Sequence, residues 1–157
     1  MAGANAVVAI AVILHALAAV IWVGGMFFAY MVLRPSAGPL EPALRLSLWQ
    51  RIFAKFFPWV WASILALLAS GYGMVFLFLG GFRGVGIHVH VMQGTGIVMI
   101  LVFLHLFFAP WRRFQSAIAA GDLPAAGRNL ETIRLLVATN LAIGLITVVV
   151  GASGRYW

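Results

Sequence analysis

Four long apolar stretches occupy most of this chain and limit what it can fold into. They run from Ala6 to Leu33, from Phe56 to Leu79, from Gly86 to Ala109 and from Leu135 to Ala152. An α-helix needs about 20 apolar residues to cross a hydrocarbon core of about 30 Å. We therefore expect an all-α fold, an integral membrane four-helix bundle, in which residues 1–157 form a single transmembrane domain.

The composition agrees with a membrane protein and narrows the available chemistry. Of the 157 residues, 64% are hydrophobic and only 8% are charged, which lies outside the range of soluble domains. Four spans leave no room for a soluble domain, so any chemistry must come from the bundle interior or the short loops. The first span has no basic segment before it and is longer than the apolar stretch of about 7–15 residues in a signal peptide. We therefore expect it to be a membrane span of the mature protein and not a cleaved signal. Because cysteine is absent, metal ligands would have to be His, Met or oxygen atoms.

The basic residues predict how the bundle is oriented. Most of them lie between spans one and two or between spans three and four: Arg34, Arg45, Arg51, Lys55, Arg112, Arg113, Arg128 and Arg134. The other two, Arg83 and Arg155, lie on the opposite side. By the positive-inside rule, both termini face the outer, periplasmic side of a bacterial inner (cytoplasmic) membrane. The net charge of +7 then reflects topology and attraction to anionic lipid, with no need of a nucleic-acid partner.

Histidines and carboxylates are distributed differently along the chain. The histidines His15, His88, His90 and His105 lie in or beside apolar stretches, whereas all three acidic residues lie in polar connecting segments. An imidazole at membrane depth is costly and usually binds a metal or a haem. A bundle without buried carboxylates argues against an ion-coupled pump or a carboxylate proton relay.

His90 and His105 fit two sites at different depths. At 1.5 Å per residue they stand about 22 Å apart along the third span, and their azimuths differ by only about 60°. Bundle cytochromes place two haems in this way, one near each side of the membrane. A second haem would need a partner for His105 on another helix, for which Met26 and Met74 are the candidates.

The outer site has more ligands, because His15 can face His88 or His90 across the bundle. If His88 and His90 are both helical, they point about 200° apart and cannot share one metal ion from the same turn. If the helix begins only after His88, the pair can hold copper with His15 as the third ligand and Met92 nearby. Haem and copper both stay open, as does a structural role in which a histidine only bonds a backbone carbonyl or an asparagine.

Two further patterns concern packing. Apolar residues share one helical face in each inner loop, at Leu40, Leu44, Leu48 and Ile52 and at Trp111, Phe114 and Ile118. We expect these segments to lie in the membrane interface. Glycines within the spans allow helix backbones to approach closely, either inside the bundle or between copies in a homo-oligomer.

Several runs of sequence resemble the CopD-like copper-resistance membrane domain over essentially the whole chain. Its first helix is similar to His15-Ala-Leu-Ala-Ala-Val-Ile-Trp22-Val-Gly-Gly25, ending in Leu33-Arg34-Pro35. Further similar runs are Phe56-Phe57-Pro58-Trp59, Gly71-Tyr72, His88-Val-His90-Val-Met92-Gln93, Phe108-Ala-Pro110-Trp111, and Ile133-Arg134 followed by Asn140-Leu141 and Gly144. The resemblance implies copper uptake or resistance beside a periplasmic copper carrier.

A second resemblance points to haem. The spacing of His15, Trp22 and Gly25 is similar to that in HemJ, a four-to-five-helix protoporphyrinogen IX oxidase that binds haem b. Arg134 with Asn140 resembles the Arg-Asn pair in the last helix of that family. This likeness implies a b-type haem held by His15.

One departure from HemJ bears on activity. That family carries a lysine after the histidine of its third helix, where this chain has Met92-Gln93. The resemblance therefore does not extend to the oxidase reaction, and whether the chain is a membrane oxidoreductase stays open.

Because the candidate ligands gather in the outer half, a bound redox centre fits the sequence better than a transport path. We expect a haem b protein, with one haem or two, that passes electrons between a quinol or small oxidant and another acceptor. Its cofactor-binding residues would be His15, His88, His90, His105, Trp22, Arg34 and Asn140. The alternative is a copper-binding or copper-transporting protein with His15, His88, His90, His105 and Met92 as ligands. A metal-free structural subunit is a third hypothesis.

Overall fold

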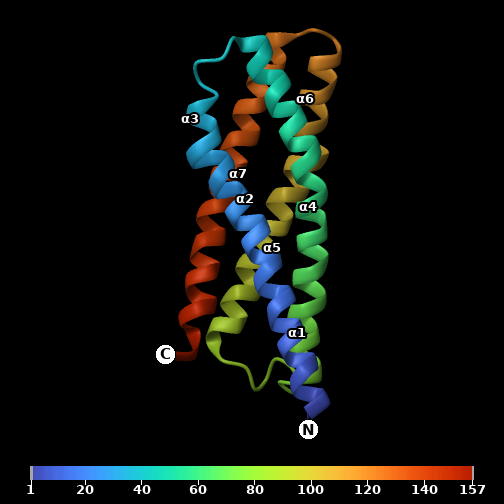
Figure 1. Cartoon of the computed structure of the whole chain (residues 1–157), viewed down its shortest axis with the longest axis vertical. Helices are drawn as coiled ribbons and strands as arrows, with labels where there is room; N and C mark the ends of the chain where they lie inside the picture. Colours follow the sequence, from blue (N-terminus) through green and yellow to red (C-terminus); the bar gives the residue numbers. More distant parts are fainter. Residues whose placement is uncertain (1, 157) are drawn as a thin grey trace.

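The computed structural model of this chain describes residues 2–156, without the side chains of residues 2–4 and 155. Every regular element in that range is helical, and Figure 1 shows them as one elongated bundle. The first span consists of α1 (Ala2–Ala19), the π-helical segment η1 (Val20–Gly24), α2 (Gly25–Phe27), a second π-helical segment η2 (Phe28–Leu33) and α3 (Arg34–Ser36). The remaining helices are α4 (Pro42–Leu77), α5 (Ile87–Phe108), α6 (Pro110–Ala119) and α7 (Leu123–Ser153), followed by the 3-10 turn η3 (Gly154–Tyr156).

Four helical segments are long and apolar enough to cross a membrane. They cover Asn5–Ser36, Pro42–Leu77, Ile87–Ala119 and Leu123–Ser153. The expected all-α membrane fold is therefore confirmed, and the chain is a multi-pass membrane protein whose immediate partner is the lipid bilayer. Both described ends of the chain and the α4–α5 loop lie at one end of the bundle, which we call the terminal end (Figure 1). The α3–α4 loop and the α6–α7 turn lie at the opposite end.

The first span does not keep one helical register. Two π-helical segments, which bond each residue to the fifth along the chain, interrupt the α-helix. The faces of the residues after Val20 therefore cannot be read from a uniform 100° step. Trp22 lies in η1 and is buried, and its ring meets Phe103 edge-on with ring centroids 6.3 Å apart. Trp22 is thus part of the core.

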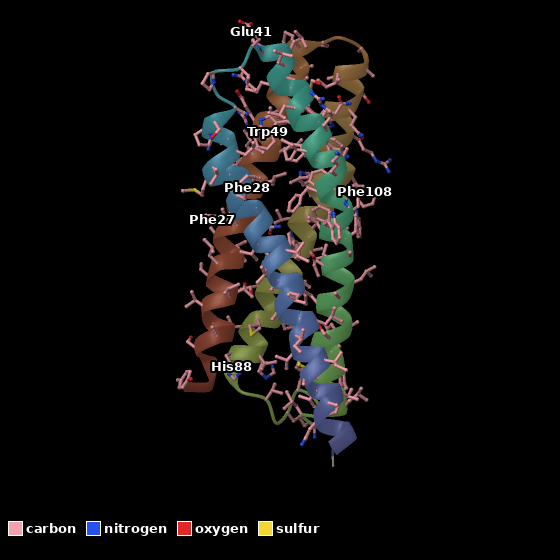
Figure 2. All side chains as sticks on the ribbon, viewed as in Figure 1. Phe27, Phe28, Glu41, Trp49, His88 and Phe108 are labelled. Atoms are coloured by element: carbon pink, nitrogen blue, oxygen red, sulfur yellow. The ribbon has the colours of Figure 1, made fainter. Side chains whose placement is uncertain are left out.

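The helices pack in neighbouring pairs around an aromatic core. α1 runs along α4, α5 runs along α7, and α6 continues α5 beyond a break at Ala109 to pack against α7. Phe57 stacks on Phe53 with centroids 5.2 Å apart and meets Trp111 edge-on at 5.2 Å. Trp49 extends this cluster toward the opposite end, as its label in Figure 2 shows. The best-packed part of the molecule therefore lies away from the chain termini.

The two apolar stripes of the inner loops differ in burial. Residues 42–55 form the first part of α4, and within it Leu46, Trp49 and Phe53 are buried while Leu44 is 59% exposed. Leu40 and Leu44 are therefore exposed, whereas Ile52 of the same stripe packs against the core. The corresponding stripe of α6 packs inward, because Trp111 and Phe114 are both buried.

Candidate metal-binding site

His15 is held by a hydrogen-bond chain that leads into α4. Its Nδ1 atom lies 2.9 Å from Oγ of Ser70, and that hydroxyl donates to the carbonyl oxygen of Ala66. Because a serine hydroxyl has only one proton and Ser70 donates it to Ala66, we assign Nδ1 of His15 as the donor to Ser70. The other ring nitrogen, Nε2, then carries the lone pair. This is the tautomer in which metal-ligating histidines are commonly held.

Gly71 makes the room for this ring. A Cβ atom at Gly71 would stand 3.3 Å from Cε1 of His15, which is tighter than most side-chain contacts. The imidazole of α1 therefore lies directly on the backbone of α4. This contact explains the Gly71 in one of the runs that resemble CopD-like proteins, and it fixes the orientation of His15.

His88 lies on a different neighbour, at the terminal end of the bundle (Figure 2). Its ring packs against Gly154, where any Cβ atom would overlap the imidazole, and it also covers Gly86. His88 therefore belongs to the junction between α5 and the C-terminal end of α7.

Two methionines continue this line of contact along α5 and α7. Met92 lies over Gly151, where a Cβ atom would stand 3.1 Å from its sulfur, and Met99 lies over Gly144, where a Cβ atom would stand 3.1 Å from its methyl carbon. Each pair is seven residues from the next on its own helix, and the helices run in opposite directions. His88, Met92 and Met99 therefore share one face of α5, with three glycines of α7 and η3 opposite.

The expected three-histidine copper clamp does not form among the described residues. α5 begins at Ile87, so His88 and His90 are both helical and point to different sides. The ring of His90 packs on Phe82 of the α4–α5 loop, with ring centroids 5.8 Å apart. The structure accordingly contains no described group of three or more His, Cys, Asp or Glu residues that could hold a metal.

The residues expected to complete a second haem site also lie apart in their surroundings. His105 is exposed on the outside of the bundle, whereas Met26 is buried within it and Met74 is half-buried. A second site that uses His105 therefore stays a prediction.

Asn140 and Arg34, which the sequence places with the ligands, lie in two different environments. Asn140 is buried on α7, where its Nδ2 donates to the carbonyl oxygen of Met99 at 3.2 Å and its Oδ1 has no partner. Arg34 lies more than about 20 Å along the first span from His15. It lines a pocket at the opposite end of the bundle.

The line from His88 to Met99 contains a residue that sequence reasoning missed. Met99 is not among the candidate ligands that the sequence indicated, since methionine in a membrane helix is usually a packing residue. The signal that could have found it is the matched spacing of Met92 with Met99 and of Gly144 with Gly151. Two antiparallel helices with the same seven-residue interval bring such positions together.

The fold and this interior define a polytopic helical membrane protein whose candidate ligands are imidazole and thioether groups. Residues 50–153 match the family of copper resistance protein D, and the chain belongs to that family. The matched range includes His88, Met92, Met99 and Asn140, and it begins after His15. No curated protein and no solved structure shows significant similarity to the chain.

Proposed function

We propose that this protein binds copper within the membrane and that His88 and Met92 form the site that receives it. The observation that carries the proposal is the register of α5 on α7, which places His88 against Gly154 and Met92 over Gly151. Membership in the copper resistance protein D family supports copper as the cargo. A transport role, suggested by the same family, would extend this binding step.

The chemistry of the two side chains suits copper(I). Residues four apart on a helix lie on the same face with Cβ atoms about 5–6 Å apart, so one ion can contact both His88 and Met92. Imidazole and thioether ligands favour copper. The chain has no cysteine, so it lacks the thiolate ligands of iron–sulfur clusters and of many zinc sites. The types of ligand at this site therefore favour copper over other metals.

Deeper groups offer a second step for the ion. Met99 lies about 10 Å beyond Met92 along α5, on the same face. Oδ1 of Asn140 is buried without a partner, and the same side chain bonds the backbone of Met99. An incoming cation would satisfy this oxygen, which is otherwise costly to bury. Met99 and Asn140 therefore support passage of the copper ion inward from the terminal end.

The proposed direction follows from the charges. Arg34, Arg45 and Arg134 all lie at the opposite end, so the positive-inside rule places that end in the cytoplasm of a bacterium. The His88 end then faces the periplasm, where a copper carrier can deliver its ion. We propose the inner membrane as the location for this reason.

Anaerobic titration of copper(I) into the detergent-purified protein, in competition with a coloured chelator, tests the site. We expect Met92→Leu and His88→Ala each to weaken binding by at least about tenfold, which corresponds to about 1.4 kcal/mol. Met31→Leu is the matched control, because Met31 is 54% exposed and lines the pocket at the other end of the bundle from His88. Wild-type affinity in both site variants would rule out this ligand pair.

A haem b bound through His15 is a second candidate, and the bond from Nδ1 to Ser70 is the observation that favours it. The residues fit one axial ligand only, because His88 and His90 lie against Gly154 and Phe82. Absorption spectra of the oxidised and the reduced protein test this candidate. A Soret band that disappears in His15→Ala would support haem, whereas copper binding by His88 and Met92 should survive that substitution.

A further inference from the structure

A basic pocket lies at the opposite end of the bundle from His88. It has a volume of about 480 Å³, within the about 300–1,000 Å³ of small-molecule sites. The first span, α4 and α7 each contribute one arginine to it. Its lining residues are Tyr30, Met31, Arg34, Pro35, Gly38, Arg45 and Arg134.

Contacts with neutral groups hold all three arginines. The guanidinium of Arg34 lies 4.8 Å from the ring centroid of Tyr30, and that of Arg134 lies 5.5 Å from the ring centroid of Trp49. Arg45 donates from Nη1 to the carbonyl oxygen of Gly38 at 3.1 Å. These contacts orient the guanidinium groups but do not neutralise them.

No carboxylate lines the pocket. Glu131, one turn before Arg134 on α7, attracts Arg134 but is exposed and outside the lining, and Arg34 and Arg45 each repel Arg134 more strongly. Nε of Arg134 is buried and has no hydrogen-bond partner. A buried donor without a partner is costly, and three converging positive charges repel one another. An anion in the pocket would remove both costs.

Phosphate is the anion that this arrangement fits. A guanidinium presents its donors in a rigid fork that matches phosphate oxygens, and three such groups can surround one phosphate. Arg34 lies two residues before the end of the first span, so we expect the pocket at the depth of lipid headgroups, and its lining includes the exposed side chain of Met31. An acyl chain can therefore continue along the outer face of the first span. Basic pockets between transmembrane helices commonly receive anionic headgroups in this way.

We propose that Arg34, Arg45 and Arg134 form a binding site for the phosphate group of an anionic phospholipid. The lipid would join the first span to α4 and α7 at the end where the α3–α4 loop leaves the bundle. This site is separate from the copper site, so either proposal can fail without the other.

Native mass spectrometry of the intact protein with added phosphatidylglycerol or phosphatidylcholine tests this site. We expect retention of phosphatidylglycerol over phosphatidylcholine, and a loss of about fivefold in that retention for each of Arg134→Gln and Arg45→Gln. Arg113→Gln is the matched control, because it removes one charge from the exposed face of α6. A loss of equal size in Arg113→Gln would show a diffuse charge effect and overturn the site.

Inorganic phosphate separates the two sources of this chemistry. We expect millimolar phosphate to leave the lipid adducts in place, because the acyl chains add contacts that a free ion lacks. If phosphate displaces the lipid or binds alone with the same dependence on Arg134, the ligand is a soluble phosphate and the lipid proposal is wrong. Circular dichroism of each variant must show wild-type helix content, and Arg134→Lys, which keeps the charge, should recover part of the retention.

Discussion

The side chain of Met92 lies over Gly151, so closely that a Cβ atom at the glycine would stand 2.9 Å from the methionine methyl carbon. The same relationship recurs two helical turns further into the bundle, between Met99 and Gly144. α5 and α7 therefore approach each other through glycine and methionine, and small residues of this kind are what bring membrane helices close together. The packing of the bundle and the candidate copper ligands are thus parts of one interface.

Gly144→Ala should destabilise the protein by about 1–3 kcal/mol, because the added methyl group overpacks the contact with Met99 and Val23. A Cβ atom there would stand 3.0 Å from Cγ2 of Val23. Gly127→Ala on the same helix is the control, since nothing lies within 4 Å of that position and alanine stabilises a helix interior by about 0.5–1 kcal/mol. Thermal unfolding in detergent measures both variants. Equal shifts in the two would contradict the described α5–α7 contact.

Ser70→Ala should cost about 1–3 kcal/mol, because it removes the hydroxyl that bonds Nδ1 of His15. Ser36→Ala, which removes a hydroxyl bonded only to its own helix at the carbonyl oxygen of Val32, should have a smaller effect. The midpoint of thermal unfolding is the measurement. Any centre held by His15 should also change its spectrum in Ser70→Ala, and an unchanged stability would show that the bond between the two side chains contributes nothing.

Phe57→Ala should be among the most damaging single changes, at about 3–5 kcal/mol. Its ring is 3% exposed and contacts Phe53, Phe103 and Trp111. Trp59→Ala removes a larger ring that is 60% exposed, so we expect little loss of stability there. The comparison is made by denaturation in mild detergent. A larger effect at Trp59 would mean that this face of α4 is covered by another molecule.

Asn140→Leu should leave stability within about 1 kcal/mol of wild type, because removing the unpartnered Oδ1 offsets the lost bond to Met99. If Asn140 serves the passage of copper, the same variant should take up less of the metal into membrane vesicles. Stability and uptake are measured on the same preparation. Wild-type uptake would exclude Asn140 from the route.

The orientation proposed from the arginines can be tested with introduced cysteines, since the chain has none of its own. Gly84→Cys and Ala120→Cys place exposed thiols in the α4–α5 loop and beside the α6–α7 turn, respectively. An impermeant thiol reagent added to intact cells should label the first and not the second. Labelling of Ala120→Cys and not of Gly84→Cys would show the opposite membrane orientation.

Several features followed directly from the sequence. The number of spans was predictable because hydrophobic length is a local property, and it set four helices without reference to their neighbours. The clustering of Arg34, Arg45 and Arg134 at one end followed in the same way, because charges must lie near the ends of spans. The copper-resistance resemblance was also present in the residues themselves and is confirmed over 50–153.

The ligand geometry depended on the tertiary structure. His88 and His90 could be assigned faces only once α5 was known to begin at Ile87 and its neighbours were in place. The two π-helical segments then changed the register of the first span after His15, which no periodicity count reveals.

The sequence by itself determined that this chain is a four-span helical membrane protein without cysteine, in which histidine and methionine are the candidate nitrogen and sulfur ligands. Only the tertiary structure decided that His15 bonds Ser70 while His88 and Met92 face Gly154 and Gly151. The physical reason is that membrane spans are specified by apolar length alone. The contacts between them depend on the close fit of small and large side chains, and that fit is settled only when two particular helices meet.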